Sequence, residues 1–167
     1  LQAVNTAFAA GVEQSAANSA TLVQPEHMRQ LLHILRTFVA VSKTCGPCFI
    51  DQMTHIFHNL QCYYVSYSAA IFHEIATHGE DISQYAHVKL MRSIKREFLK
   101  LIENFVASSE QPEYVSWQCW PLLMGPILED YCNSIPPVRD AAVLSVLAAC
   151  VEKLKGHLSG ETAVITE

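Results

Sequence analysis

Apolar residues recur at spacings of three and four along almost the whole chain, and no convincing strand-like alternation appears. This pattern predicts an all-α protein. A first helix is predicted over residues 25–44, because Pro25 suits a first helical turn and Cys45-Gly46 suits an end. One stripe of this helix collects the residues expected in the core, namely Met28, Leu31, Leu32, Leu35, Phe38, Val39 and Ser42.

A longer second helix is predicted over residues 47–78, from Pro47 to the stop that Gly79 offers through its left-handed conformations. Its apolar stripe consists of Met53, Phe57, Leu60, Tyr64, Tyr67 and Ile71. A third helix, over residues 85–107, has two chemically distinct sides. Its apolar side carries Met91, Ile94, Phe98, Leu101 and Phe105, and its polar side carries Lys89, Arg92, Arg96 and Lys100.

A fourth helical element is predicted over residues 113–133, where interruptions at Pro121 and Pro126 should leave a short helix and then a principal one. Asp140 can cap a fifth helix over residues 140–155, because its carboxylate can accept a hydrogen bond from a free N–H group of the first turn. We expect the inward face of that helix to consist of Val143, Leu144, Leu147, Val151 and Leu154.

The predicted elements group into helix pairs, 25–44 with 47–78 and 85–107 with 113–133, with a partial helix near 1–16 before them and an extra helix at 140–155 after them. Stacked antiparallel helix pairs of this kind, repeated every ~50–60 residues, are typical of HEAT or armadillo repeats. A closed bundle of about five helices fits the periodicity equally well. The odd helix at each end favours an open arrangement, so we predict that residues 1–167 form a single HEAT-repeat segment of an α-solenoid.

Composition excludes several classes of protein. The chain has 167 residues, of which 50% are hydrophobic and 16% charged, and this is far too apolar for a disordered linker. The net charge of −5 predicts no direct binding of nucleic acid. No apolar run approaches the roughly 18 residues of a membrane-spanning helix, so we expect no membrane insertion. The chain starts at Leu1 without a signal-peptide pattern, and we expect it to be a piece of a longer protein.

The cysteines leave two chemical alternatives open. All six lie in apolar, helical-looking sequence, which favours free thiols in a reducing compartment: Cys45, Cys48, Cys62, Cys119, Cys132 and Cys150. The string Cys45-Gly46-Pro47-Cys48 also occurs in thiol oxidoreductases, but there it follows a β-strand, whereas here an amphipathic helix precedes it.

Zinc is the second chemical alternative. Its candidate ligands are Cys45, Cys48, His55, His58 and Cys62. Convergence of these ligands would turn the apolar stripe of the second helix away from the core, because His55 and His58 lie about 60° apart around the helix. A thiol oxidoreductase or a zinc-binding helical adaptor centred on Cys45 and Cys48 is therefore the alternative to a binding scaffold. We identify no catalytic residue and predict no cofactor.

The polar side of the third helix is a candidate partner-contact face. Its basic residues are Lys89, Arg92, Lys95, Arg96 and Lys100. They could dock an acidic partner, because a cluster of positive charge attracts negative surfaces. The alternative is a solvated outer face that Glu97 and Glu103 partly neutralise.

Three motifs follow one another in the second half of the chain. The first is a basic-apolar string made of Met91, Arg92, Lys95, Arg96, Glu97, Leu99, Lys100, Leu101 and Ile102. A proline-led helix then carries Pro121, Leu122, Leu123, Asp130 and Tyr131. The last element carries Arg139, Asp140, Val143, Leu144, Ser145, Lys153, Leu154, Gly156 and His157. In order and spacing these motifs resemble the exportin-1 family of the importin-beta/karyopherin superfamily, and the amino-terminal half is similar more loosely.

The resemblance implies a run of HEAT repeats from the carboxy-terminal half of a nuclear export receptor. Receptors of this family shuttle through the nuclear pore between nucleus and cytoplasm, where they meet nucleoporins. They carry cargo with a leucine-rich export signal together with the GTP form of the Ran GTPase. The resemblance places this segment past the repeats that form the signal groove. It is therefore expected to act as a scaffold rather than an enzyme, and to bind neither an export signal nor GTP on its own.

Overall fold

The computed structural model describes residues 23–110 and 112–155, and all regular structure within these ranges is helical. The α-helices are α3 (Pro25–Cys45), α4 (Ile50–His78), α5 (Ala86–Ser108), α6 (Pro112–Tyr114), α7 (Trp120–Leu122), α8 (Leu128–Asn133) and α9 (Ala142–Lys153). Short 3-10 turns at Gly46–Phe49 and Glu80–Gln84 connect α3 to α4 and α4 to α5. The predicted partial helix near 1–16 lies outside the described residues. None of the described helices is long and apolar enough to cross a membrane.

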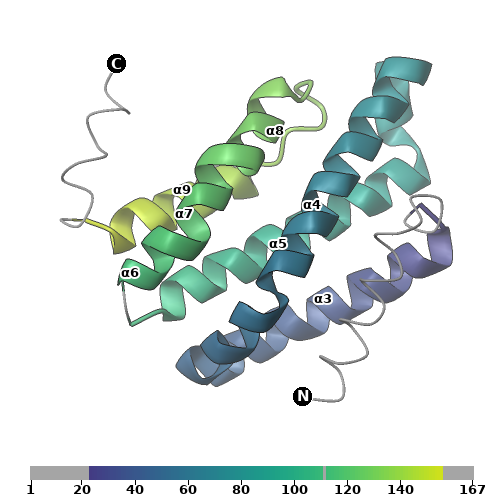
Figure 1. The fold of residues 1–167 in the computed structure, drawn as a ribbon. Coiled ribbons are helices and arrows are strands. Elements are labelled where there is room, and N and C mark those ends of the chain that lie inside the picture. Colours follow the sequence, from purple (N-terminus) through teal and green to yellow (C-terminus); the bar gives the residue numbers. More distant parts are fainter. Residues whose placement is uncertain (1–22, 111, 156–167) are drawn as a thin grey trace, which may run out of the picture.

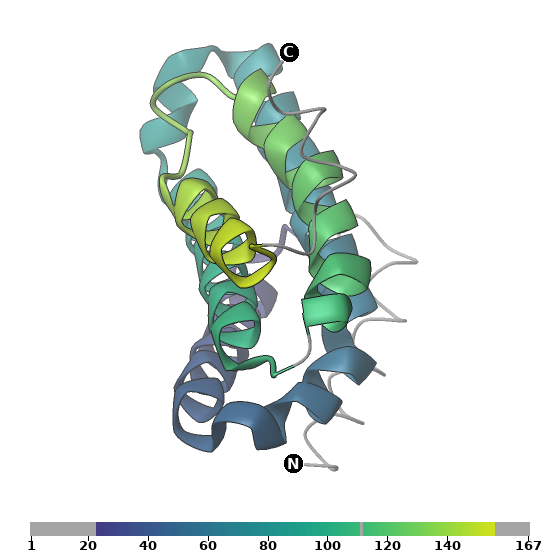
Figure 2. The same ribbon diagram turned by 90° about the vertical axis from the view of Figure 1, so that its left-hand side faces the viewer.

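The helices form two layers. In one layer α5 lies between α3 and α9 and packs against both (Figure 1). The other layer contains α4, which packs against α5, and the run from α6 to α8 (Figures 1 and 2). The chain runs in opposite directions in the two layers, so that α3 with α4, and α5 with the run α6–α8, are antiparallel pairs (Figure 1). This is the predicted all-α, HEAT-like solenoid fragment.

The buried side chains form one hydrophobic core along the seam between the layers. All seven residues of the predicted stripe of α3 are buried, and so are the five apolar residues predicted for α5. In α4 the predicted stripe is buried from Phe57 to Ile71, while the side chain of Met53 lies outside the described part. Aromatic contacts connect α4 to α5, with ring centroids 5.5 Å apart for Tyr64–Phe98 and 6.2 Å apart for Phe57–Phe105.

The fourth element is interrupted directly before Pro126, as predicted, but not at Pro121. The prediction of a short helix and then a principal one is corrected in its order, because the longer part, over residues 112–124, comes first and the shorter part ends with α8; π-turns lie at Val115–Cys119 and Leu123–Ile127. A π-turn places the hydrogen-bond acceptor five residues away instead of four, which relieves the crowding that a proline ring causes. The run kinks at Gly125, whose φ of −88° and ψ of −107° are not helical, directly before Pro126.

The inward face of α9 differs from the prediction. Val143 and Leu154 are buried as expected, whereas Leu144 is 47% and Val151 45% exposed and Leu147 is half-buried. The buried face consists of Val143, Val146, Cys150 and Leu154. The helix is apolar on nearly every side, so its periodicity does not identify the face that meets α5. Asp140 makes the predicted hydrogen bond to the first turn, because its Oδ1 accepts from the Ala142 N–H at 3.0 Å, but the residue that directly precedes the helix is Ala141.

Candidate functional site

The basic residues predicted as a partner-contact face on α5 lie in different environments. Lys89 and Arg96 are exposed, Arg92 and Lys100 are half-buried, and Lys95 is buried at 7% exposure. The first four follow one another at spacings of three and four and form one stripe along the helix. Lys95 lies beside that stripe and faces α4 and α8. Its burial corrects the expectation that all five side chains lie on one solvated face.

Lys95 is the centre of a buried polar network. Its Nζ lies 2.8 Å from Asp130 Oδ1 and 2.7 Å from Asp130 Oδ2. The Tyr64 hydroxyl donates a hydrogen bond to Asp130 Oδ2 at 2.9 Å, and Lys95 Nζ lies 4.9 Å from the centre of the Tyr64 ring. Burial lowers the pKa of Lys95, and the Asp130 carboxylate opposes this shift. The network connects α4, α5 and α8 at one point of the core.

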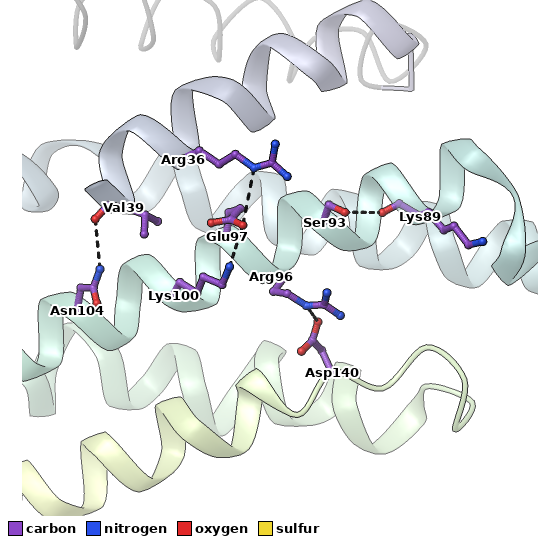
Figure 3. A network of polar contacts seen from close by, with 9 residues as sticks. All are labelled: Arg36, Val39, Lys89, Ser93, Arg96, Glu97, Lys100, Asn104 and Asp140. Atoms are coloured by element: carbon purple, nitrogen blue, oxygen red, sulfur yellow. Dashed lines mark hydrogen bonds and ion pairs between the residues drawn. The ribbon is translucent and has the colours of Figure 1, made fainter. Parts of the chain in front are cut away.

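Two further ion pairs connect α5 to its neighbours in the same layer (Figure 3). Arg96 Nε lies 2.7 Å from Oδ2 of Asp140, which is two residues before the start of α9. Glu97 lies 3.0 Å from Lys100 Nζ and 3.9 Å from Arg36 Nε of α3. Arg96 and Lys100 are therefore engaged within the fold, although their side chains remain 47% and 44% exposed.

Lys89 and Arg92 are the cations of the stripe that remain available. Neither forms an ion pair within the described residues. Figure 3 shows Lys89 near the start of α5, where its backbone carbonyl accepts a hydrogen bond from the Ser93 hydroxyl at 2.9 Å. Contact of this face with a partner therefore stays a prediction, and it depends mainly on Lys89 and Arg92.

The cysteines and histidines do not assemble a chemical centre in the part of the chain that is described. Cys45 ends α3 and Cys48 lies in the following 3-10 turn, and both are exposed free thiols. Among the candidate zinc ligands, Cys62 and His58 come close to each other, with 3.9 Å between Sγ and Nε2. No group of three His, Cys, Asp or Glu side chains among the described residues could hold a metal ion. The side chain of His55, another candidate zinc ligand, lies outside the described residues.

Sequence reasoning missed the roles of Asp130 and Tyr64 in this network. Asp130 was visible as part of an Asp-Tyr motif, and Tyr64 as a member of an apolar stripe. Neither signal indicates that the two residues meet Lys95, because the separation of α4, α5 and α8 in space follows only from the packing of the helices. A lysine on the border of an apolar face was the one available hint, since such residues are buried mainly when paired.

Comparison with known proteins identifies the family. The sequence model of the family described as CRM1 C terminal matches residues 52–167. Protein EXPORTIN 1B of Arabidopsis thaliana is 34% identical over 163 residues, which cover 98% of this chain and 15% of that protein. The chain belongs to the exportin-1 family. Exportin-1 of Schizosaccharomyces pombe is 29% identical over the same length, and Exportin-1 of Drosophila melanogaster is 32% identical over 139 residues, or 83% of this chain and 13% of that protein.

The exportin-1 match includes the described network. Residues 52–167 contain nearly all of α4 and everything from α5 to α9, including Tyr64, Lys95 and Asp130. The chain spans about 15% of the length of the first curated relatives, so it corresponds to a small part of an exportin. The similarity to exportins extends over 98% of the chain and includes the amino-terminal half, where the sequence resemblance was looser.

Proposed function

We propose that this chain is a scaffold segment of a nuclear export receptor that carries leucine-rich-signal cargo out of the nucleus together with Ran-GTP. The observation that carries the proposal is the similarity to exportins over 98% of the chain. The layered helix pairs support it, because stacked pairs are the repeating units of an α-solenoid. In this proposal the segment has no chemistry of its own, and the hydrolysis of GTP belongs to Ran.

The polar network gives the scaffold a specific task. A solenoid changes its curvature through small rotations between neighbouring helix pairs, and these rotations can connect events at distant sites. The Lys95–Asp130 pair, with the Tyr64 hydroxyl on the same carboxylate, joins both layers across two helix pairs. A buried ion pair loses much of its favourable energy when its geometry changes. We infer that this part of the receptor transmits movement as a stiff unit.

A chimeric receptor tests the proposal. The aligned segment of Exportin-1 from Schizosaccharomyces pombe would be replaced by this chain, and export of a fluorescent reporter with a leucine-rich signal would be measured in fission yeast. We expect the chimera to restore export, whereas a chimera with Asp130→Asn should fail because the buried network is broken. A chimera that is present at normal amounts but does not export would contradict the proposal.

The partner-contact face has its own test. We propose that Lys89 and Arg92, with Arg96 and Lys100 beside them, meet an acidic surface of Ran, cargo or a nucleoporin-linked factor, while Lys95 acts inside the fold. Lys89→Glu with Arg92→Glu in the chimera should weaken assembly with Ran-GTP and cargo about three- to tenfold, and more strongly at low salt.

A control matched in charge is Lys43→Glu with Lys155→Glu. Both side chains are exposed and form no ion pair within the described residues. This control separates a local contact from a general effect of net charge. Equal weakening by the two double variants, or none by either, would remove the face from the proposal and leave the scaffold role standing.

A further inference from the structure

A groove of about 490 Å³ lies between the carboxy-terminal half of α4 and the residues around α8. Apart from Ser68, its α4 wall is apolar and includes Val65, Ala69, Phe72 and Ala76. The opposite wall consists of Pro126, Glu129, Asp130, Asn133, Ser134 and Ile135. Phe72 is 65% exposed and Val65 44% exposed. Large apolar side chains that are exposed together at a hollow surface indicate a binding site.

The apolar wall is a second stripe on α4. The first stripe, from Phe57 to Ile71, is buried in the core. The second stripe contains residues 65, 69, 72 and 76, whose spacings of four, three and four place them on one side of the helix. At 1.5 Å per residue this stripe is about 16 Å long, or about three helical turns. Its length and spacing match a docked helix with anchors at i, i+4 and i+7.

The groove is built on a rigid base. Asp130 lies in its wall, and the carboxylate is held from the core side by Lys95 Nζ at 2.7 Å and by the Tyr64 hydroxyl at 2.9 Å. Pro126, in the same wall, lies at the kink of the helical run. These contacts set the position of α8 relative to α4 without any occupant. A groove that exists before binding avoids the ordering cost that a flexible site would add.

The charge of the rim selects the occupant. The only charged side chains among the lining residues are Glu129 and Asp130, and no Lys or Arg lines the groove. Lys95 neutralises Asp130. Glu129 is exposed and takes part in no ion pair with any described residue. The rim thus carries one uncompensated negative charge beside an apolar wall, which complements a segment with apolar anchors and an adjacent cation.

We propose that the groove between α4 and α8 docks an amphipathic helix of a partner protein, with apolar side chains against Phe72 and Val65 and a Lys or Arg opposite Glu129. This contact is separate from the basic face of α5, which selects acidic surfaces. The proposal assigns a binding site and goes beyond the scaffold role. It does not depend on that role, because it rests on the geometry of α4 and α8 alone.

The test uses the full 167-residue chain and a phage-displayed library of helical peptides. Each peptide has apolar residues at i, i+4 and i+7, and the flanking positions vary among Lys, Glu and Gln. We expect selection of peptides with Lys beside the apolar face. In fluorescence anisotropy, Phe72→Asp should weaken a selected peptide at least tenfold, because it places a charge in the apolar wall. Glu129→Gln should weaken it about two- to fivefold, as expected for a surface ion pair.

Matched controls separate the groove from general stickiness. Leu144→Asp introduces the same charge at another exposed apolar position, on α9, and should leave peptide affinity unchanged. Glu129→Lys should reverse the preference toward peptides with Glu. Thermal unfolding should show that Phe72→Asp keeps the fold, since the side chain is 65% exposed.

Four outcomes would overturn the proposal: no peptide whose binding depends on Phe72, selection of acidic or uncharged flanks, unchanged peptide affinity in Glu129→Gln, or a dimer of the chain that Phe72→Asp dissociates. The last outcome would assign the groove to a second copy of the chain.

Discussion

The buried Lys95–Asp130 pair allows a quantitative test of what holds the two layers together. The side chains are 9% and 15% exposed, and Nζ lies 2.7 Å from Oδ2. Asp130→Asn keeps the size of the side chain and an acceptor for the Tyr64 hydroxyl, but it removes the carboxylate that Lys95 Nζ contacts, so that the buried ammonium loses its ion-pair partner. Removing one partner of a buried ion pair costs about 3–5 kcal/mol. Because some solvent reaches this pair, we expect a loss near the lower end, about 3 kcal/mol.

The assay is urea denaturation followed by circular dichroism, with the free energy of unfolding extrapolated to water. At about 2–4 °C per kcal/mol for a chain of this size, the melting temperature should fall by roughly 6–12 °C. The exposed pair Arg29–Glu26 is the matched control, with side chains 66% and 73% exposed and 3.6 Å between its atoms. Glu26→Gln removes the same kind of charge there and should cost less than about 1 kcal/mol.

A double variant identifies the cause of the loss. Lys95→Met with Asp130→Asn removes both charges while keeping an acceptor for Tyr64, so it should recover most of the stability that Asp130→Asn alone loses. Two results would refute the reasoning. If Asp130→Asn costs no more than Glu26→Gln, the pair is effectively solvated. If the double variant is no more stable than Asp130→Asn, the unpaired buried ammonium is not the source of the loss.

Three further predictions concern pH, thiols and ligands. Burial raises the pKa of the Tyr64 and Tyr67 hydroxyls, so above about pH 10 the unfolded chain releases protons that the folded chain keeps. Stability should therefore fall there by up to about 1.4 kcal/mol per pH unit for each tyrosine, as measured by urea denaturation alongside tyrosinate absorbance. Burial also raises the pKa of Cys150 to about 11 and that of Cys119 further. Iodoacetamide should therefore alkylate the four exposed thiols of the native chain and spare these two until unfolding, as mass spectrometry would show. The isolated chain should bind neither a leucine-rich export peptide nor GTP in fluorescence anisotropy.

Each of these predictions has an opposing result. A tyrosine titration that completes near pH 10 without unfolding would show that Tyr64 and Tyr67 are solvated. Rapid alkylation of Cys119 or Cys150 in the native chain would contradict their burial at 1% and 0% exposure. Specific binding of GTP or of the export peptide would contradict the scaffold role.

The helices of this protein were largely predictable because amphipathic spacing is a local property. α3, for example, begins at Pro25 as predicted and buries the predicted stripe. Prediction failed where helical spacing and local residue preferences allowed more than one structure. α9 is apolar on nearly all sides, so Leu144 and Val151 could not be assigned to a face from spacing. At Pro121 the expected break is replaced by a π-turn over Val115–Cys119, whereas directly before Pro126 the helical backbone is interrupted at Gly125, as the proline predicts.

In the candidate site, too, helical periodicity predicted the positions of the residues but not their contacts. Lys89, Arg92, Arg96 and Lys100 are placed on one stripe by helical periodicity alone. Which of them stays available was decided by residues far away in the chain, since Asp140 engages Arg96. Lys95 is removed from the surface by an aspartate 35 positions later.

The amino-acid sequence by itself determined that this chain is helical, where its core stripes lie and which family it resembles. Only the tertiary structure decided which charges meet, and where an apolar stripe remains open between α4 and α8. The physical reason is the sequence separation over which the interactions act. Helix formation depends on hydrogen bonds and side chains within about four residues, whereas a buried ion pair or a groove depends on the separation of helices that the sequence does not encode locally.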